Sequence, residues 1–427
     1  MGVVKIGCEV EKMVYTSDFE GNSDNEVIEN AILAKGADDI VVIEAKKDGS
    51  PWLLDRAILI PENTTVILRG CKIKLSDSCR DNFFRTNNCG IGIDEPVKIK
   101  NVHIKGEGMA VLEGADYPRA TGDGGKILKN PAPYSEEDAI KVSDWIPEER
   151  RKSGKLEFMD VHAYTYGTDA GKEDESQYGD WRDIGILFAN IDDFSIENIK
   201  MVCAHGWHIS IEAGTNGKIK NIEFRADMSK TIDGFVNNIE NQDGIDIRNG
   251  CSNIIISDIT GMTGDDVVAL TAIKHSRMRK GGSMRSSHVM GSDWSKRESG
   301  IHDIVIRNVH AETSLCWIVR LLAVETEIYN VVIDGIVDMC EDRYHFGTLL
   351  FGEGDGGYGK NLPDCIHDVT VSNVICAKNG HSISVAGYLA NSTITNVITK
   401  CKDYKPINVN RENGLNNVVI SNVVTAK

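Results

Sequence analysis

A pattern of seven residues with regularly placed apolar positions recurs along the chain. Each copy has Ile or Val at its fourth and seventh positions, and its sixth position is Asn in seven of nine copies, with Asp258 and Gly335 as the exceptions. The alternation of β-branched and polar residues has a period of two, which is typical of strands and not of helices. The nine copies are 96–102, 193–199, 216–222, 253–259, 303–309, 330–336, 368–374, 391–397 and 417–423.

The spacing of the copies predicts how these strands are arranged. After Asp193 the copies start 23, 37, 50, 27, 38, 23 and 26 residues apart. The shortest spacing fits one coil of a solenoid, and the longer ones fit coils that carry inserted loops. We therefore predict an all-β fold, a single-stranded right-handed parallel β-helix, with Asn side chains stacked as a ladder at one corner. A propeller is not favoured, because the blade-specific aromatic residues are missing.

The rest of the chain fits one such domain over residues 1–427. Ser23–Leu33 combines a helix N-cap, acidic residues in the first turn and an apolar face, which predicts a short helix. It would lie in an N-terminal cap, residues 1–39, over the exposed end of the solenoid. Residues 116–180 are charged, rich in Gly and Pro and weakly periodic, and we expect them to form a long loop insertion over a cleft. The first strands are expected at Ile40–Glu44, Ala57–Ile60 and Thr65–Arg69.

Composition narrows the class of partner. The chain has 41% hydrophobic and 26% charged residues and a formal net charge of −17, which disfavours nucleic acid as a partner. No apolar run is long enough to span a membrane, and the N-terminus lacks the features of a signal peptide. The 11 cysteines are scattered among apolar strands, which favours free thiols and a cytoplasmic location. The composition leaves open whether the chain forms a homo-oligomer.

Two short acidic segments carry the predicted chemistry. Asn241–Arg248 reads Asn-Gln-Asp-Gly-Ile-Asp-Ile-Arg, and Thr263–Leu270 reads Thr-Gly-Asp-Asp-Val-Val-Ala-Leu. They place Asp243, Asp265 and Asp266 about one coil apart. Cleavage of a glycosidic bond needs one carboxyl group to protonate the leaving oxygen and another to activate water. We predict that these three residues are catalytic.

These segments resemble motifs of the polygalacturonase family, glycoside hydrolase family 28. Asn241–Asp246 resembles the family's Asn-Thr-Asp-Gly stretch, and Gly264–Ala269 resembles its Gly/Gln-Asp-Asp motif. The resemblance implies a cofactor-free glycosidase that inverts configuration. In it Asp265 would be the general acid, and Asp243 and Asp266 would hold and deprotonate the water.

Two later motifs of the family are absent. Ser314–Ile318 stands where the family has Gly-His-Gly, and Asp342–Gly347 stands where it has the carboxylate-binding Arg-Ile-Lys. The acids are therefore kept while the uronate-binding residues are not, which predicts a preference for neutral or differently charged sugars.

Counting from the start of each repeat brings further side chains to the face that carries the acids. The substrate-binding residues predicted from this count and from the neighbouring aromatic and imidazole side chains are His205, Trp207, His208, Cys316, Trp317, Arg343 and His381. No metal is expected, because Cys203–His208 has no second ligand cluster at ligand spacing.

The sequence thus predicts a cytoplasmic, polygalacturonase-like glycosidase that acts on the end of an oligosaccharide. One alternative is a β-helix lyase or an intramolecular glycosyl transferase, which would use its carboxylates without water. Another is a non-catalytic sugar-binding solenoid.

Overall fold

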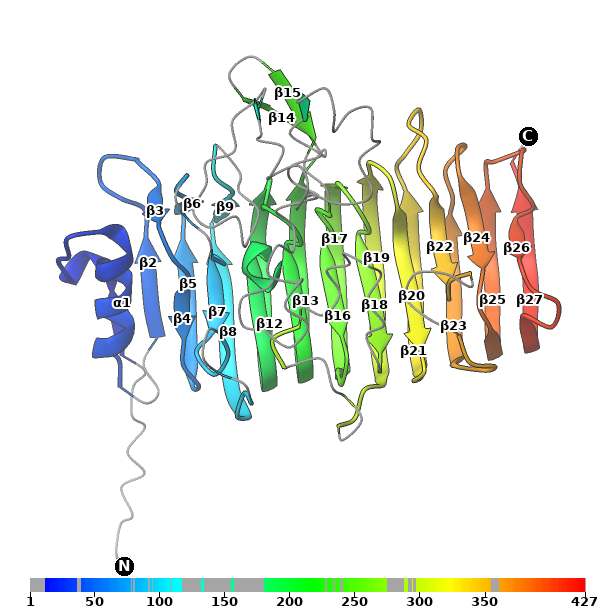
Figure 1. The fold of residues 1–427 in the computed structure, drawn as a ribbon, viewed down its shortest axis with the longest axis horizontal. Helices are drawn as coiled ribbons and strands as arrows, with labels where there is room; N and C mark the ends of the chain where they lie inside the picture. Colours follow the sequence, from blue (N-terminus) through cyan, green and yellow to red (C-terminus); the bar gives the residue numbers. More distant parts are fainter. Residues whose placement is uncertain are drawn as a thin grey trace, which may run out of the picture.

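The computed structural model describes residues 12–36, 40–77, 79, 81–90, 93, 95–108, 110–116, 132–133, 155–156, 180–226, 229–232, 235–238, 241–274, 288–290, 294, 297–354 and 361–426. The main body is the predicted right-handed parallel β-helix, with coils stacked along the long axis of Figure 1. One sheet contains 23 strands, and every strand pair recorded in it is parallel. Most of the proposed 116–180 insertion lies outside the described residues.

The elements of the N-terminal coils are mostly short, whereas several later strands bend around more than one side of the solenoid. The first elements are β1 (Met13–Tyr15), η1 (Thr16–Asp18), α1 (Asp24–Ala34), β2 (Ile40–Glu44), β3 (Trp52–Leu54), β4 (Ile58–Ile60), β5 (Thr64–Arg69), β6 (Lys72–Leu75), β7 (Phe84–Thr86), β8 (Ile99–Glu107), β9 (Val111–Glu113), β10 (Ala132–Pro133), β11 (Lys155–Leu156) and η3 (Asp180–Asp183). The central strands are β12 (Ile186–Val202), β13 (Ile209–Arg225), β14 (Ser229–Ile232), β15 (Phe235–Asn238), β16 (Ile245–Arg248), β17 (Ser252–Thr263), β18 (Val268–Ile273), β19 (Ile301–Thr313) and β20 (Trp317–Val324). The last strands are β21 (Ile328–Asp338), β22 (Gly347–Phe351), β23 (Ile366–Ile375), β24 (His381–Val385), β25 (Leu389–Thr399), β26 (Ile407–Val409) and β27 (Leu415–Thr425).

The core is built from aliphatic side chains at the same position of successive coils. Because parallel strands pair in register, an inward residue meets an inward residue of the next coil, and all of these contribute to one continuous core. One such column is Ile186, Ile209, Ile245, Val268, Val319, Leu349, Ile383 and Ile407. The residues that alternate with them in the same strands point outward, so these positions can hold catalytic or binding side chains.

The repeated Asn positions are explained by the backbone at the corners. The sixth residue of every copy has a positive φ, from 53° at Asn422 to 70° at Gly335. The first residue also has a positive φ in every copy except the one that begins with Pro96. Asn, Asp and Gly tolerate the left-handed conformation better than other residues, so the repeat selects them at two bends of each coil.

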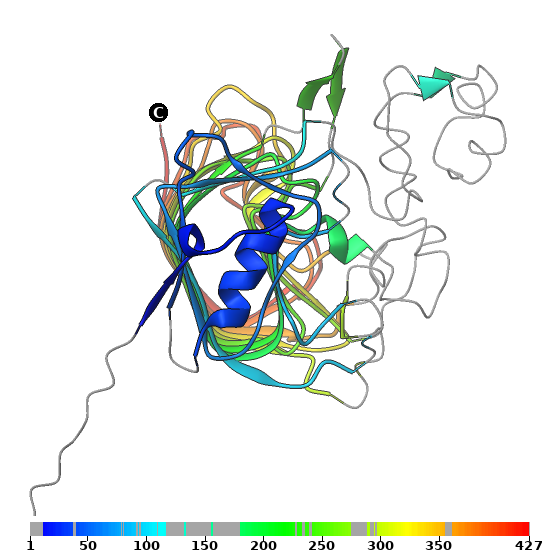
Figure 2. The same cartoon turned by 90° about the vertical axis from the view of Figure 1, so that its left-hand side faces the viewer.

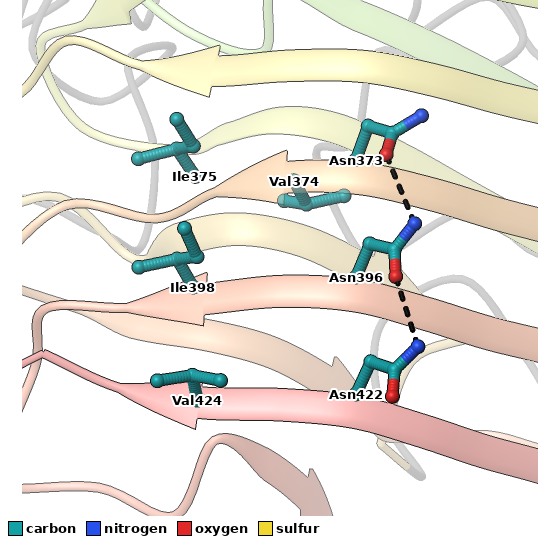
Figure 3. Close-up of a pocket in the computed structure, with 7 residues that line it drawn as sticks. All are labelled: Asn373, Val374, Ile375, Asn396, Ile398, Asn422 and Val424. Atoms are coloured by element: carbon teal, nitrogen blue, oxygen red, sulfur yellow. Dashed lines mark hydrogen bonds between the residues drawn. The ribbon is translucent and has the colours of Figure 1, made fainter.

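The predicted ladder of side-chain amides is present, and a second one accompanies it. In Figure 3 the Asn396 amide donates to Asn373 at 3.1 Å, and the Asn422 amide donates to Asn396 at 3.2 Å. At the other bend Asn330 donates to Asp303 at 3.0 Å. The hollow drawn in Figure 3 is lined by β23, β25 and β27, and not by the strands that carry the acids.

The N-terminal helix covers the open end of the solenoid, as predicted. Figure 2 shows α1 lying across the end of the first coils. The Ser23 hydroxyl accepts a hydrogen bond from the N–H of Glu26, which caps the helix, and Ile28 and Ile32 are buried against the core. The first strands also lie where the sequence places them, and β2 has the expected bounds. That residues 1–427 form one domain stays a prediction.

The ten described cysteines are all free thiols. None of the helices in the described ranges has the length and apolar character needed to cross a bilayer.

Candidate active site

The predicted catalytic residues come together just before two neighbouring strands. Asp243 lies two residues before Ile245 of β16, and Asp266 lies two residues before Val268 of β18, and these two strand residues pair in register. The N–H of Gly244 donates to the carbonyl of Asp266 at 2.8 Å, which fixes this alignment. The β14–β15 hairpin, which projects from the coils in Figure 1, precedes Asp243 in the chain.

The same position on the flanking coils carries aromatic residues. The register of β13, β16, β18, β20, β22 and β24 aligns one residue from each of six successive coils. We call this series the site column. It consists of Trp207, Asp243, Asp266, Trp317, Gly347 and His381.

Asp266 is the most constrained of the three acids. Its side chain is fully buried, and its Oδ1 accepts the N–H of Trp317 at 2.8 Å. Its Oδ2 accepts a charged hydrogen bond from Arg320 at 3.2 Å, and Arg320 also binds Glu353 at 3.0 Å. Asp266 is therefore held in one orientation by a backbone donor and a cation.

Asp265 is only partly buried and is oriented through its backbone. Its carbonyl accepts the hydroxyls of Thr263 at 2.6 Å and Thr313 at 2.7 Å. Its Oδ1 accepts the N–H of Asp266 at 2.8 Å. Of the three predicted acids, Asp265 is the one with the greatest access to solvent, since Asp243 and Asp266 are both buried.

A fourth carboxylate, Asp246, belongs to the same cluster. It lies on β16 on the outward side between the core residues Ile245 and Ile247, and it is 2% exposed. One of its oxygens, Oδ2, is buried without a protein hydrogen-bond partner in the described structure. In register terms Asp246 is aligned with Ala269 of β18 and with Arg320 of β20.

The crowding of these acids changes their protonation. Burial is the main cause that raises the pKa of Asp243 well above its ordinary value, and the charges of Asp265, Asp246 and Asp266 add to it. Burial also raises the pKa of Asp246 well above its ordinary value, with the nearby acids adding to the effect. Burial raises the pKa of Asp266 to about 7, although Arg320 opposes the rise. All three shifts favour the protonated form of these carboxyl groups, and a protonated carboxyl group is what general acid catalysis requires.

His205 and His208, both predicted to bind substrate, form hydrogen bonds within the protein. His205 is 3% exposed, and its Nε2 accepts the N–H of Ala115 at 3.0 Å. His208 is fully buried against Phe224, with its Nδ1 at 2.7 Å from the carbonyl of Asp243. Burial lowers the pKa of His208 to about 4, so the ring is neutral and donates from Nδ1. His208 thus positions the Asp243 backbone, and its burial leaves it no surface for substrate.

Trp207 borders the acids on the N-terminal side and adjoins a covered part of the surface. The guanidinium of Arg248 lies 4.7 Å from the centre of the Trp207 ring, and Arg248 binds His288 Nε2 at 2.8 Å. His288 in turn donates from Nδ1 to Glu212 at 2.9 Å. Beyond Trp207 a second apolar cluster, which we call the N-terminal wall, packs on the outside of the coils. Its buried residues are Cys89, Trp181, Ile184, Leu187, Ala189, Val289, Met290 and Trp294.

On the C-terminal side the acids meet Cys316 and Trp317. Cys316 is partly buried, and burial together with Asp265 and Asp266 raises the pKa of its thiol, so it is uncharged at neutral pH. Trp317 is 8% exposed, and its ring is nearly parallel to that of His381, with centroids 6.3 Å apart. The register places Cys316 on the coil that follows Asp265, and His381 lies two coils beyond Cys316.

Arg343 lies at the same corner but outside the site column. Its Nη1 donates to the Ser314 hydroxyl at 2.8 Å and contacts the Met262 sulfur at 3.4 Å. Ser314 is the residue that follows Thr313, which binds Asp265. Arg343 is exposed, so its guanidinium is available to a ligand at the edge of the site.

Two groups of described residues have the donor atoms of a metal site. The candidate ligand atoms of Asp265, Asp266 and Cys316 lie within 4.8 Å of one another, and so do those of the buried Asp338, Cys340 and His345. In the first group both Asp266 oxygens already have donors, and the thiol is protonated. In the second, Asp338 Oδ2 accepts from His345 at 2.8 Å and from Thr348 at 2.7 Å.

Fold and site together define a parallel β-helix with a carboxylate cluster on its outer face. Residues 159–327 match the model of the glycosyl hydrolases family 28, and this span includes the four acids, Trp207, Trp317 and Arg320. The resemblance drawn from the sequence is thereby confirmed for this part of the chain.

Solved structures share the fold at low sequence identity. A family 28 exopolygalacturonase from Yersinia enterocolitica is 14% identical with a TM-score of 0.53, over 97% of this chain and 78% of that one. A hyperthermoactive exopolygalacturonase from Thermotoga maritima is 17% identical with a TM-score of 0.50, over 97% and 92% of the two chains. PfbA, a surface protein and adhesin of Streptococcus pneumoniae, is 13% identical with a TM-score of 0.56, over 97% of both chains. No curated protein matched the sequence.

Two site residues were missed from the sequence, although each carries a signal. Asp246 alternates with the core residues Ile245 and Ile247, so it had to face outward beside Asp243. Arg320 is the one charged residue of β20, an otherwise apolar strand one coil beyond the Asp pair. A charge at an outward position next to predicted acids is the pattern that would have identified both.

Proposed function

We propose that the protein is an inverting glycosidase that removes units from one end of a short oligosaccharide. The observation that carries this proposal is the cluster of four acids, three of them buried and with raised pKa values, beside a fourth that solvent reaches. Such a cluster can supply a proton and a base at the same pH.

The division of roles follows from accessibility and hydrogen bonding. Asp265, the most accessible acid, donates a proton to the glycosidic oxygen while the bond from that oxygen to the anomeric carbon breaks. A water molecule attacks the anomeric carbon from the opposite face and gives its proton to the carboxylate of Asp266 or Asp243. Asp266, which Arg320 keeps partly ionised against the effect of burial, is suited to accept that proton. The proton left on the cluster then returns to Asp265 for the next cycle.

Action at a chain end is supported by the asymmetry of the surface. The N-terminal wall covers the outside of the coils that carry Leu187 and Ala189, and these coils precede that of Trp207. A bound oligosaccharide can then extend from the acids only toward the C-terminal coils. The proposed 116–180 insertion would add to this closure.

The charge of the site favours a neutral sugar over a uronate. Arg320 binds Asp266 and Glu353, and its charge also acts on Asp243 and Asp246. Among the described residues of the cluster this cation is already paired, so a substrate carboxylate would meet an excess of negative charge, and the exposed Arg343 at the edge could bind it instead. For a cytoplasmic protein, which the sequence predicts, a short oligosaccharide is the expected form of substrate.

The proposal is tested by incubating the protein with neutral and uronic oligosaccharides and measuring the products by mass spectrometry. Release of monosaccharide from one end, lost in Asp265→Asn with folding retained, is the expected result. Elimination products with a double bond would indicate a lyase. Binding without any product would indicate a sugar-binding solenoid.

A further inference from the structure

A row of exposed aromatic side chains continues from Asp265 toward the C-terminal end. The position one residue before the site column is Asp265 on its own coil, Cys316 on the next and Phe346 on the one after, since Trp317 pairs with Gly347. The N–H of Phe346 donates to the carbonyl of Leu315 at 2.8 Å, in agreement with this register. Phe346 is 41% exposed and its neighbour Tyr344 is 58% exposed.

The row continues across a glycine to a second aromatic residue. Gly347 pairs with His381, and Ile383 pairs with Ile407, so Gly380 follows Phe346 and Tyr404 follows Gly380 in the same position. Tyr404 is 40% exposed, and its ring centroid lies 4.0 Å from that of His381. His381 contacts Trp317 on its other side and thereby fixes Tyr404 in relation to the site column.

Gly380 occupies the position of the row between the two aromatic residues and has no side chain. Its φ is +87°, which side chains other than Gly rarely adopt. A Cβ there would lie 2.5 Å from the carbonyl oxygen of His345 and 3.2 Å from the backbone of Phe346. No larger residue fits there without a backbone shift. Phe346 and Tyr404 stand about 10 Å apart, two coils, and the ring of His381, from the coil between them, contacts Tyr404.

We propose that Phe346, Gly380 and Tyr404 form a binding subsite for a pyranose unit of the substrate, remote from the bond that is cleaved. This inference rests on the proposed function for its choice of ligand. Exposed aromatic rings beside a polar site are suited to contact the apolar face of a sugar ring. The row shares its position with Asp265 and lies on the side opposite the N-terminal wall, which is where an oligosaccharide held at the acids would extend.

The test measures binding in a background that cannot turn over. Asp265→Asn, alone or with Phe346→Ala or Tyr404→Ala, is titrated calorimetrically with homologous neutral β-linked gluco-oligosaccharides and oligogalacturonides, from disaccharide to hexasaccharide. The control is Tyr329→Ala, which removes an aromatic ring stacked between His302 and His367 on another side of the solenoid. Circular dichroism and melting curves establish that every variant is folded.

We expect each subsite variant to weaken binding of the longer oligosaccharides of at least one series by roughly three- to tenfold. The disaccharide and the Tyr329 control should bind like the parent. Equal losses at all lengths, no loss at any length, or no binding of either series by the folded parent would overturn the subsite. If the length-dependent loss is found while the wild-type protein releases no product, the subsite stands and the hydrolytic function fails.

Discussion

Replacing Arg320 by Gln should move the pH dependence of catalysis upward. Arg320 is the cation that opposes the effect of burial on Asp266, from which it is 3.2 Å away, and the Asp266 side chain is only 1% exposed. An opposite charge at this range lowers the pKa of a carboxyl group by roughly 1–3 units. Its removal should therefore raise the pKa of Asp266 from about 7 by about that amount.

The consequence for the rate follows from the fraction of Asp266 that is ionised. With a pKa of about 7, half of the base is ionised at neutral pH in the wild-type protein. A rise of about one unit leaves roughly a tenth, so kcat/KM at neutral pH should fall about fivefold or more. Because the group must be ionised to act, the activity should recover as the pH is raised through the new pKa.

The assay is the pH profile of kcat/KM on whichever oligosaccharide the wild type cleaves. Glu353→Gln is the matched control, because Glu353 binds the other nitrogen of the same guanidinium, Nη2, at 3.0 Å. We expect a smaller shift for that variant. An Arg320→Gln variant that is folded and has the wild-type profile would refute the role of Asp266 as the base.

Three further results are expected. The pKa of Asp266 is raised in the folded state, so its contribution to stability is present below its unfolded pKa of about 4 and is lost as the pH rises to about 7. In denaturant unfolding, the stability of Asp266→Asn should therefore fall less than that of the wild type between these pH values, by up to about 4 kcal/mol. Equal pH slopes for the two proteins would contradict this. Asn396→Ala should lower the free energy of unfolding by about 1–3 kcal/mol, because two amide hydrogen bonds are lost and Ala must adopt a φ of 55°. Asn396→Gly should recover part of this loss, because Gly adopts that φ without strain. Equal stability of the two variants would argue against backbone strain. Cys316→Ser should reduce kcat only slightly, because the thiol is protonated, and a folded variant without activity would show that the thiol takes part in the chemistry.

The fold was predictable because its rule is local. Each coil needs two residues in the left-handed conformation, and only Asn, Asp and Gly accept it readily. The repeat can therefore be recognised in the sequence from these residue types, at positions such as Asn198 and Asn373. The inward Ile and Val positions then determine the register. The same logic placed the helix at Ser23, where a capping side chain precedes an apolar face.

Only those site residues that belong to short sequence motifs could be predicted. Asp265 and Asp266 form a motif, and Asp243 lies in another, so all three could be found. Arg320 acts on Asp266 from a later coil across 54 residues of sequence, and no local pattern links them. His208 was assigned to substrate because of its neighbours in the sequence, but its burial depends on Phe224 and on the coil of Asp243, which only the packed structure reveals.

The central claim, hydrolysis with inversion by the acid cluster, is tested most directly by proton NMR of the first product released by the wild-type protein. The proposal predicts that the anomeric proton signal appears first in the configuration opposite to that of the cleaved bond and then equilibrates by mutarotation. The Asp265→Asn protein should release no product. A product that first appears with the configuration of the cleaved bond would contradict the inverting arrangement of Asp243, Asp265 and Asp266.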